Sequence, residues 1–270
     1  MQTPDTSAGW ACDTRTVSDG IFDSSIAPHY DEASSGMFDP EVLVPTVDML
    51  ADIAGEGRAL EFAIGTGRVA IPLSERGVDV VGVELSRSMV DQMMAKPGSE
   101  TIPVTIGDMA TTRVEGEFEL VYLVYNTISN LLAQDEQVAC FCNASEHLSP
   151  GGSFVIEVGV PRLRQLPAGE TFLVFDASDG HFGVDEFDLV NQRSTSHHAW
   201  IRDGRGRTFD STHRYAWPAE YDLMARIAGL QFENRWANWQ RDPFTADSTS
   251  HISVWRKPST SPPEPRSSVR

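Results

Sequence analysis

Several features that would direct this chain to a membrane or through one are missing from its sequence. No run of about twenty apolar residues occurs, so no segment has the length and apolarity of a membrane-spanning helix. The N-terminus has neither a basic region nor an apolar stretch of signal-peptide length. These absences predict a cytoplasmic protein with no membrane partner.

Cysteine is scarce as well. The 270 residues include three cysteines. Cys140 and Cys142 fall in a segment with the apolar periodicity of a helix, and Cys12 lies in a polar leader. This spacing matches neither a disulfide framework nor a zinc site, so we expect no bound metal.

Positive charge is the third shortage. Lys and Arg number 21 against 39 Asp and Glu, which gives a formal net charge of −18. A protein that neutralises phosphates needs a basic stripe, and the sequence shows none. We therefore expect no nucleic-acid partner and favour a small-molecule substrate, while the sequence leaves a homodimer open.

The chain divides into two polar ends and a central domain. Residues 1–25 are rich in Ser, Thr, Asp and Gly and are predicted to form a mobile leader, and residues 258–270 a disordered tail. Residues 26–257 are long enough for one α/β domain.

Apolar strands and amphipathic helices alternate through the first part of this domain. Strands are predicted at 59–63, 79–84, 103–107, 118–125 and 153–158, with helices between them. Such alternation is typical of a doubly wound, mainly parallel sheet. The rhythm then changes to strand-like segments separated by Asp-Gly and Gly-Arg-Gly turns, which predicts an antiparallel insertion over about residues 159–217. A last helix, closed by Gly229, and two more strands follow.

The most informative segment is LEFAIGTGR, residues 60–68, which reads as a strand, a glycine turn and the start of a helix. Gly65 and Gly67 permit positive φ and let the backbone approach a ligand closely. The segment also fits the dinucleotide pattern G-x-G-x-x-A, with Glu84 at the distance of a ribose-binding acid. The glycines therefore fit both NAD and S-adenosylmethionine.

Glu61 distinguishes between these two cofactors. It ends the first strand, close to where a dinucleotide would bring its pyrophosphate to the helix N-terminus, and a carboxylate there would repel it. S-Adenosylmethionine instead carries an ammonium and a sulfonium, which a carboxylate attracts. The alternative is that Glu61 only caps or pairs locally.

Two further acids end the second and third strands. Glu84 is placed to accept both ribose hydroxyls, and Asp108 to accept the adenine amino group. Leu85 and Met109 are then the apolar side chains on either side of the adenine ring. The alternative for Asp108 is a residue that stabilises a turn.

These residues resemble the class I S-adenosylmethionine-dependent methyltransferases. The resemblance spans roughly Tyr30 to Lys257 and rests on EFAIGTG, GVELS, GDM and LSPGG in the family's order, with Ala63 in place of the usual first glycine. It implies a doubly wound, seven-stranded, mainly parallel sheet with a Rossmann-like methyltransferase fold. The antiparallel insertion after the fifth strand is similar to that of the bacterial natural-product subgroup, which includes deoxysugar N,N-dimethyltransferases.

The resemblance also implies roles for particular residues. Glu61, Gly65 and Gly67 would hold the methionine end of S-adenosylmethionine, while Tyr30 would close over the cofactor from a lid at about residues 26–40. The full predicted cofactor set is Tyr30, Glu61, Gly65, Gly67, Arg68, Glu84, Leu85, Met89, Asp108, Met109, Tyr125 and Asn126.

The acceptor is expected at the same edge of the sheet, because doubly wound folds bind ligands at the carboxyl ends of their strands. Methyl transfer is an in-line displacement, and the acceptor must also lose a proton, which a nearby base assists. Glu157 ranks first for this role, with His213 and Tyr30 as the other catalytic candidates. The predicted acceptor pocket contains Thr127, His198, Trp200 and Tyr215, although a solvated strand face is the plainer interpretation of the histidines.

The sequence thus predicts transfer of a methyl group to a small organic acceptor in secondary metabolism. An amine, a hydroxyl and an electron-rich carbon such as an indole all remain open as the acceptor atom. The alternatives are an NAD(P)-dependent oxidoreductase, which the same glycines and Glu84 support, and a regulator that binds the cofactor without catalysis.

Overall fold

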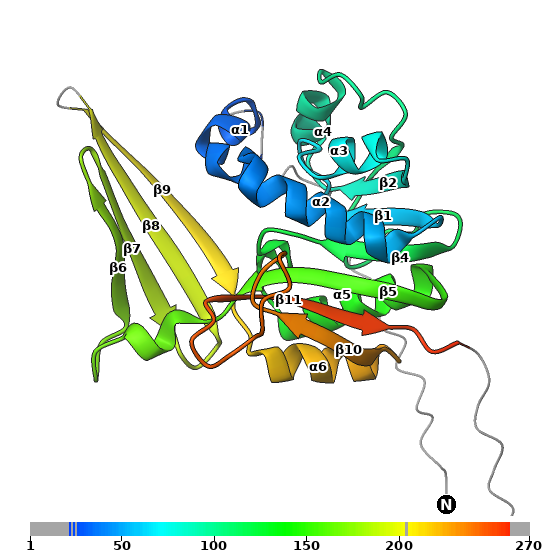
Figure 1. The fold of residues 1–270 in the computed structure, drawn as a ribbon. Helices are drawn as coiled ribbons and strands as arrows, with labels where there is room; N and C mark the ends of the chain where they lie inside the picture. Colours follow the sequence, from blue (N-terminus) through cyan, green and yellow to red (C-terminus); the bar gives the residue numbers. More distant parts are fainter. Residues whose placement is uncertain (1–21, 23, 25, 203–204, 260–270) are drawn as a thin grey trace, which may run out of the picture.

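The computed structural model describes residues 22, 24, 26–202 and 205–259. Most of the predicted leader, with Cys12, and most of the predicted tail lie outside these residues. The described chain forms two β-sheets with helices around the larger one (Figure 1).

The larger sheet has seven strands in the order β10-β11-β5-β4-β1-β2-β3. β11 runs antiparallel to both of its neighbours, and the remaining pairs within β5-β4-β1-β2-β3 are parallel. This arrangement confirms the predicted mainly parallel, doubly wound sheet. The strands are β1 (Arg58–Phe62), β2 (Asp79–Glu84), β3 (Val104–Ile106), β4 (Phe118–Leu123), β5 (Leu148–Gly159), β10 (Gln231–Trp236) and β11 (Ser250–Arg256).

Helices cover both faces of this sheet. α5 (Gln134–His147) and α6 (Pro218–Ile227) pack on one face, and α2 (Pro40–Ala54), α3 (Ala70–Glu75) and α4 (Arg87–Met94) pack on the other. Alternate residues of a strand point to opposite faces, so β1, β2, β4, β5 and β11 contribute to both cores.

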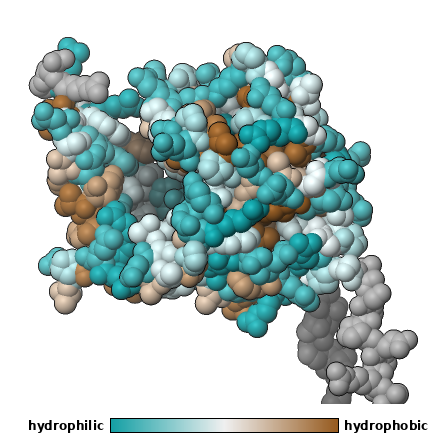
Figure 2. Space-filling view, in the orientation of Figure 1, coloured by the Kyte–Doolittle hydropathy of each residue, from teal (hydrophilic) through white to brown (hydrophobic). Residues whose placement is uncertain are grey.

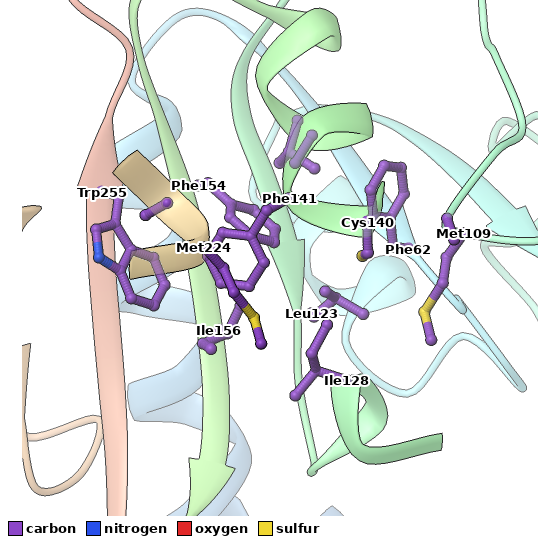
Figure 3. Packing of buried hydrophobic residues seen from close by; sticks show 14 of the residues in the cluster. Phe62, Met109, Leu123, Ile128, Cys140, Phe141, Phe154, Ile156, Met224 and Trp255 are labelled. Atoms are coloured by element: carbon purple, nitrogen blue, oxygen red, sulfur yellow. The ribbon is translucent and has the colours of Figure 1, made fainter. Parts of the chain in front are cut away.

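The core beneath α5 and α6 is rich in aromatic rings. Phe141 of α5 lies with its ring centroid 5.0 Å from that of Phe154 and 5.2 Å from that of Trp255, both in edge-to-face contact (Figure 3). These rings join α5 to β5 and β11, and edge-to-face packing adds to the free energy of apolar burial. The aromatic rings therefore join the antiparallel strand β11 to the core of the sheet.

Helix starts follow the capping signals in the sequence. The Ser86 hydroxyl accepts a hydrogen bond from the Met89 backbone N–H at 3.2 Å and so caps the N-terminus of α4. Asp39 caps α2 in the same way through the Glu41 N–H, with Pro40 in the first helical position.

A second sheet follows β5 and contains four antiparallel strands. They are β6 (Phe172–Ser178), β7 (His181–Asp188), β8 (Arg193–Arg202) and β9 (Arg205–Arg214), paired in chain order. The sheet leans away from the larger one (Figure 1) and falls within the predicted insertion. The segment 185–202, which looks strand-like throughout in the sequence, contains a turn between β7 and β8 with Gln192 at φ 53°.

A buried ion pair fixes the base of this second sheet to the larger domain. Arg214, 4% exposed, donates to Glu220 of α6 at 2.5 Å and to the side-chain oxygen of Gln137 of α5 at 2.6 Å. Hydrogen-bonded partners of this kind offset the cost of burying the guanidinium. The four-stranded sheet is thus held at its base.

The predicted lid region folds into three short helical turns, η1 (Ala27–His29), α1 (Tyr30–Ala33) and η2 (Ser35–Phe38). Asp31 joins this segment to the glycine turn, because its carboxylate accepts a hydrogen bond from the Thr66 hydroxyl at 2.6 Å and pairs with Lys96. Lys96 in turn donates to the Thr66 carbonyl. The lid therefore packs directly against the loop after β1.

Candidate functional site

A cavity of about 1880 Å³ lies between the carboxyl ends of the larger sheet, the lid and the inner face of the four-stranded sheet. Figure 2 shows the hollow between the two parts of the molecule. A typical small-molecule site occupies about 300–1,000 Å³, so this cavity has room for a nucleoside-sized ligand and a second molecule.

The cavity has two principal walls. The strand-end wall consists of lining residues that follow β1, β2, β3 and β4, namely Ala63, Gly65, Glu84, Leu85, Met89, Gly107, Asp108, Met109, Tyr125, Asn126 and Thr127. The sheet wall consists of lining residues on or beside β7, β8 and β9, namely His181, Asp185, Phe187, Ser194, Ser196, His198, Trp200, Arg205, Gly206, Arg207, Phe209, Ser211, Thr212, His213 and Tyr215. Tyr30 and Phe22 close the cavity from the lid side.

The glycine turn between β1 and α3 has the positive φ values that its sequence predicts. Gly65 has φ 59° and Gly67 has φ 76°. A Cβ atom added to Gly67 would lie 2.8 Å from Cγ of Met93, so close packing also demands glycine there. Ala63, which replaces the family's first glycine, has φ 52° and carries the steric cost of that conformation.

Glu84 ties the ends of β1 and β2 together. Its side chain is buried, with one carboxylate oxygen accepting from the Gly65 N–H at 2.8 Å and the other from the Ser86 N–H at 2.9 Å. A carboxylate oxygen can accept more than one hydrogen bond, and Glu84 lines the cavity.

Asp108 and three apolar residues continue the strand-end wall. One Asp108 oxygen accepts from the Ala110 N–H at 2.8 Å, which is the turn-stabilising contact weighed in the sequence analysis. The side chain is nevertheless exposed to the cavity. Leu85, Met89 and Met109 supply apolar surface beside it, as a flat heteroaromatic ring would require.

Glu61 lies behind this wall instead of in it. It is 2% exposed and accepts a hydrogen bond from the Tyr122 hydroxyl at 2.9 Å. Burial raises the pKa of its carboxyl to about 8, although bonds from Tyr122 and the Ala70 backbone act in the opposite direction. Burial therefore favours the protonated carboxyl in this conformation, and the predicted role of Glu61 in holding the methionine end of the cofactor stays a prediction.

The turn after β4 is strained and held by Glu157. Tyr125 and Asn126 both have left-handed backbones, with φ 56° and 59°. One Glu157 carboxylate oxygen accepts from the Tyr125 N–H at 2.8 Å, and the Glu157 carbonyl accepts from the Asn126 N–H at 3.1 Å. Strained turns of this kind persist where surrounding bonds enforce them, and they cluster at ligand sites.

The same contacts revise the position predicted for Glu157. Its second carboxylate oxygen accepts from the Trp239 indole N–H at 2.9 Å, and the residue does not line the cavity. The sequence interpretation, a carboxylate that points into the cleft, does not match this geometry, because both oxygens are turned toward protein donors. Glu157 instead positions the Tyr125-Asn126 turn.

The lid contributes Tyr30 and one residue that the sequence analysis missed. Burial raises the pKa of Tyr30 to about 12, so its hydroxyl stays protonated at neutral pH and acts as a donor, not as a phenolate base. Phe22 packs edge-on against Tyr30 with ring centroids 5.7 Å apart, and its carbonyl accepts from the Ser86 hydroxyl. Phe22 belongs to the predicted leader, where it is one of two aromatic residues, with Trp10, in a mainly polar stretch.

Arg68 links the lid to the turn after β4. Its guanidinium donates to the Met37 carbonyl at 3.2 Å and lies 5.7 Å from the centroid of the Tyr125 ring. Arg68 and Gly67, like Glu61, are predicted cofactor residues that lie behind the cavity lining. The other nine members of that predicted set line it.

The sheet wall brings the predicted acceptor residues together. His213 and Tyr215 share one face with His198 and Trp200, and all four line the cavity with Thr127. On the opposite face His197 is bonded to Asp210 and Glu186 instead. The alternation of side chains along β8 thus separates the cavity residues from the outer ones.

His213 is held as a neutral imidazole. Burial lowers its pKa, Nε2 bonds to the Ser211 hydroxyl at 3.2 Å, and Nδ1 is enclosed with no hydrogen-bond partner among the described residues. The sequence analysis missed His181, which lies on the same face at the start of β7. The sequence held one signal for it, because His181 and Asp185 are an even number of residues apart and so share a face of a strand.

Two further features concern metal-ligating side chains and membrane-spanning helices among the described residues. Within residues 22, 24, 26–202 and 205–259, no three His, Cys, Asp or Glu side chains form a group that suits a metal ion. Across the same ranges, no helix has the length and apolarity needed to cross a bilayer.

The strand-end wall suits a sulfonium nucleoside better than a dinucleotide. A pyrophosphate needs free N–H groups at the glycine turn and at the start of the following helix. Here Glu84 takes the Gly65 N–H, and Glu61 bonds the Ala70 N–H at the start of α3. Carboxyl groups thus occupy the positions that a pyrophosphate would need.

Comparison with known proteins finds that the chain is similar to methyltransferases. A family model described as a methyltransferase domain matches residues 59–152. The CcbJ methyltransferase from Streptomyces caelestis is 36% identical, with a TM-score of 0.72 over 79% of this chain and 88% of that one. Cypemycin N-terminal methyltransferase from a Streptomyces species is 27% identical over 244 residues, 87% of this chain and 96% of that protein.

A more distant structure shares the fold. CalS10 from Micromonospora echinaspora, described as an amino pentose methyltransferase, has a TM-score of 0.65 at 18% identity over 84% of this chain and 96% of that one.

Proposed function

The chain belongs to the S-adenosylmethionine-dependent methyltransferases, and from that premise we propose that it methylates an amine of a small organic acceptor held between the two walls of the cavity. S-Adenosylmethionine is the methyl donor of this family, and it supplies an electrophilic methyl group on a sulfonium. The residues of this chain bind the two reactants, orient them and manage the proton that the acceptor loses.

The strand-end wall is the proposed cofactor site. Glu84, whose carboxylate lines the cavity, accepts the ribose hydroxyls, and Asp108 accepts the adenine amino group with its second oxygen. Leu85 and Met109 contact the adenine ring. Ala63, Gly65 and the Tyr125-Asn126 turn present backbone to the methionine portion, where no long side chain intervenes.

The proposed role of Glu61 is a change in its protonation when the cofactor binds. A cationic ammonium near the glycine turn lowers the pKa of the buried carboxyl, so the group ionises as the cofactor binds. The sequence argument for attraction then applies to the bound state, and binding at neutral pH is accompanied by proton release from Glu61.

The sheet wall is the proposed acceptor site. Neutral histidines, hydroxyls and the Trp200 ring face the strand-end wall across the cavity, with Tyr30 as a hydroxyl donor at the lid side. His213 is the catalytic candidate from the sequence that lines this wall, and we propose that it contacts the acceptor. Enclosure by the lid excludes water, which strengthens each polar contact inside.

The names of relatives support nitrogen as the acceptor atom and natural-product biosynthesis as the setting. The cypemycin enzyme is described as an N-terminal methyltransferase and CalS10 as an amino pentose methyltransferase. Hydroxyls and electron-rich carbons remain the competing acceptors in any screen.

One observation carries the proposal most directly. The cavity that begins at Glu84 and Asp108 continues without interruption to the histidine-lined sheet wall. A cofactor-binding regulator without catalysis would have no need of a second, chemically distinct wall.

Two measurements test the proposal. S-Adenosylhomocysteine is expected to raise the melting temperature while NAD+ and NADH leave it unchanged, and the reverse result would favour the oxidoreductase. S-Adenosylmethionine labelled in its methyl group is then incubated with panels of amines, amino sugars, phenols and indoles. Labelled amines would support the proposal. Label found only in phenols or indoles would show that the acceptor atom is oxygen or carbon instead of nitrogen. No labelled product would favour the non-catalytic regulator.

A variant pair sharpens the screen. His213→Ala is expected to lower turnover while the affinity for S-adenosylhomocysteine stays unchanged. His197→Gln, on the outer face of the neighbouring strand, is the control and should retain full turnover. Equal turnover in His213→Ala and the wild type would remove His213 from the acceptor site.

A further inference from the structure

An irregularity in β6 changes which side chains face the cavity. Val174 pairs with Val184, but Asp176 pairs with Gly183, so an extra residue stands between the two pairs. Phe175 and Asp176 consequently both reach His181, the first through its ring and the second through its carboxylate. Bulges of this kind re-aim side chains and are frequent next to active sites.

The bulge completes a chain of three polar side chains. Oδ2 of Asp176 lies 2.5 Å from Nδ1 of His181, and Nε2 of His181 lies 3.1 Å from Nδ1 of His198. The contact with His181 lowers the pKa of Asp176, so its carboxylate is ionised and can only accept. His181 therefore carries a proton on Nδ1, and in its neutral form its Nε2 accepts from Nδ1–H of His198.

This order of donors leaves one nitrogen exposed to a ligand. Burial, together with His181, lowers the pKa of His198, which favours its neutral form near pH 7. With its proton on Nδ1, neutral His198 carries a lone pair on Nε2. That atom has no hydrogen-bond partner within the part of the chain that the structure describes, and His198 lines the cavity. His213 differs, because its Nδ1 is enclosed and its Nε2 is bonded to Ser211.

Aromatic packing holds His198 in this orientation. Its ring stacks on Trp200 with centroids 5.3 Å apart and planes at 5°, and Phe175 contacts its other side at 5.2 Å. Phe175 fits because Gly183 has no Cβ, which would otherwise lie 2.3 Å from the Phe175 ring. A Trp face also stabilises a histidine that has gained a proton.

The charged groups around His198 come from three strands. They are Asp176 on β6, His181 and Asp185 on β7, and Asp210 and His213 on β9. Asp185 is already bonded to Ser196 and paired with Arg162, and Asp210 is bonded to His197. The Asp176-His181 pair is thus the one bonded directly to His198, and the Asp176 side chain is 35% exposed and in contact with solvent.

We propose that Asp176, His181 and His198 form a proton relay that removes the proton from the acceptor amine and passes it to solvent. An N–H bond of the acceptor ammonium breaks, its electron pair stays on nitrogen, and the proton bonds to Nε2 of His198. The Nδ1 proton of His198 moves to Nε2 of His181, the Nδ1 proton of His181 moves to Asp176, and Asp176 releases it to water. His198 is then a catalytic residue, while His181 and Asp176 act through it.

This inference rests on the proposed function for its substrate, but its first test does not. Long-range proton–nitrogen correlation spectra of protein labelled with 15N-histidine and saturated with S-adenosylhomocysteine report the tautomer of each ring. At pH 7 His198 is expected with its proton on Nδ1 and with Nε2 bare, whereas free imidazole side chains prefer the proton on Nε2. A wild-type His198 with its proton on Nε2 would overturn the relay.

Variants give the same test a control. Asp176→Ala is expected to remove the Nδ1 preference of His181 and, with it, that of His198. His197→Gln is the control. His197 lies next to His198 on β8 but on the outer face, where it is bonded to Asp210 and Glu186, so its loss should leave the signals of His181 and His198 unchanged. Unchanged tautomers in Asp176→Ala would contradict the relay, provided that the variant melts as cooperatively as the wild type.

Turnover supplies the second test, using the amine that gains label in the screen. A general base contributes about 100-fold or more, so His198→Gln is expected to lower kcat by about 100-fold and to flatten the rise of kcat with pH. KM and the affinity for S-adenosylhomocysteine should change by less than about threefold, and Asp176→Asn should lower kcat by about tenfold. A wild-type kcat and pH profile in His198→Gln would refute the relay. The absence of any methylated amine would instead refute the proposed function, and the tautomer measurement alone would then show whether the Asp176-His181-His198 hydrogen bonds exist.

Discussion

The two walls of the cavity are built by different means. The strand-end wall comes from loops, with its carboxylates held by backbone N–H groups and with Ala63, Tyr125 and Asn126 forced into left-handed backbones. The sheet wall comes from regular strands, whose alternate side chains supply imidazoles, hydroxyls and rings. Backbone geometry therefore defines one wall and side-chain identity the other.

This difference separates a constant task from a variable one. A wall made of strained backbone and fixed carboxylates suits a single ligand that every member of the family shares. A strand face can change its lining by single substitutions without altering the fold, because every second side chain faces the cavity. We therefore expect substitutions in the strand-end wall to alter cofactor binding and stability, and those in the sheet wall to alter turnover.

The largest expected effect concerns Glu84. Glu84→Ala removes the acceptor of two backbone N–H groups along with the proposed ribose contacts, and a hydrogen bond to a charged group contributes about 1.5–3 kcal/mol. Calorimetry should therefore show the affinity for S-adenosylhomocysteine lowered by about 100-fold or more. His198→Gln, in the sheet wall, is the control and should keep the wild-type affinity. Similar losses in both variants would break the distinction between the walls.

Gly67 is expected to have the next largest effect, on stability. Gly67→Ala places a Cβ atom 2.8 Å from Met93 at a residue with φ 76°, so we expect a loss of about 2 kcal/mol. In a domain of this size that loss lowers Tm by about 4–8 °C in a thermal melt. Gly206→Ala on β9, where no atom lies within 4 Å of the added Cβ, should leave Tm unchanged. An unchanged Tm in Gly67→Ala would mean that the turn is not rigid.

Glu61 predicts a pH dependence. Its folded-state pKa of about 8 lies above the ordinary value of 4.5, so the folded chain holds a proton that the unfolded chain has lost between those values. Its stabilising contribution is present at low pH and is lost as pH rises through about 8. Glu61→Gln lacks this titrating group. Between pH 7 and pH 9 the wild type should therefore lose about 1.4 kcal/mol, or about 3–5 °C in Tm, relative to Glu61→Gln.

The control for this series is Glu56→Gln, which changes an exposed carboxylate before β1. Its Tm curve should run parallel to that of the wild type. If the Glu61→Gln curve is parallel as well, the carboxyl is already ionised in the ligand-free protein, and cofactor binding would release no proton from Glu61.

The smallest expected effect is at Ala63. Ala63→Gly relieves the left-handed backbone, which costs about 1–2 kcal/mol for alanine, but adds about 0.5–1 kcal/mol of unfolded-state entropy. Differential scanning calorimetry should show a gain of about 2 °C in Tm. Ala59→Gly in the extended strand β1 should instead lower Tm, and a loss in both variants would show that Ala63 is not strained.

The sequence predicted the strand-end wall better than the sheet wall, for physical reasons. Glu84 and Asp108 occupy strand ends next to glycine and cap signals, so local pattern placed them correctly. Burial was harder to foresee, because nothing in the sequence shows that Tyr122 lies beside Glu61 or that Trp239 lies beside Glu157. Those contacts join segments far apart along the chain.

The sheet wall was predicted through alternation alone. His198, Trp200, His213 and Tyr215 were found because side chains two residues apart share a face of a strand. Asp176 was not found, because a bulge breaks that alternation at Phe175. The four-stranded sheet runs from Phe172 to Arg214, inside the predicted insertion of about residues 159–217, and the predicted domain limits stay a prediction.

The central claim is that carboxylates at the ends of β2 and β3 hold a cationic nucleoside on the strand-end wall. A crystal structure of the complex with S-adenosylhomocysteine tests it most directly. The ribose hydroxyls are predicted within hydrogen-bond distance of Glu84, with the adenine ring between Leu85 and Met109 and its amino group on Asp108. A nucleoside bound to the sheet wall, or one whose ribose contacts neither Glu84 nor Asp108, would contradict the account.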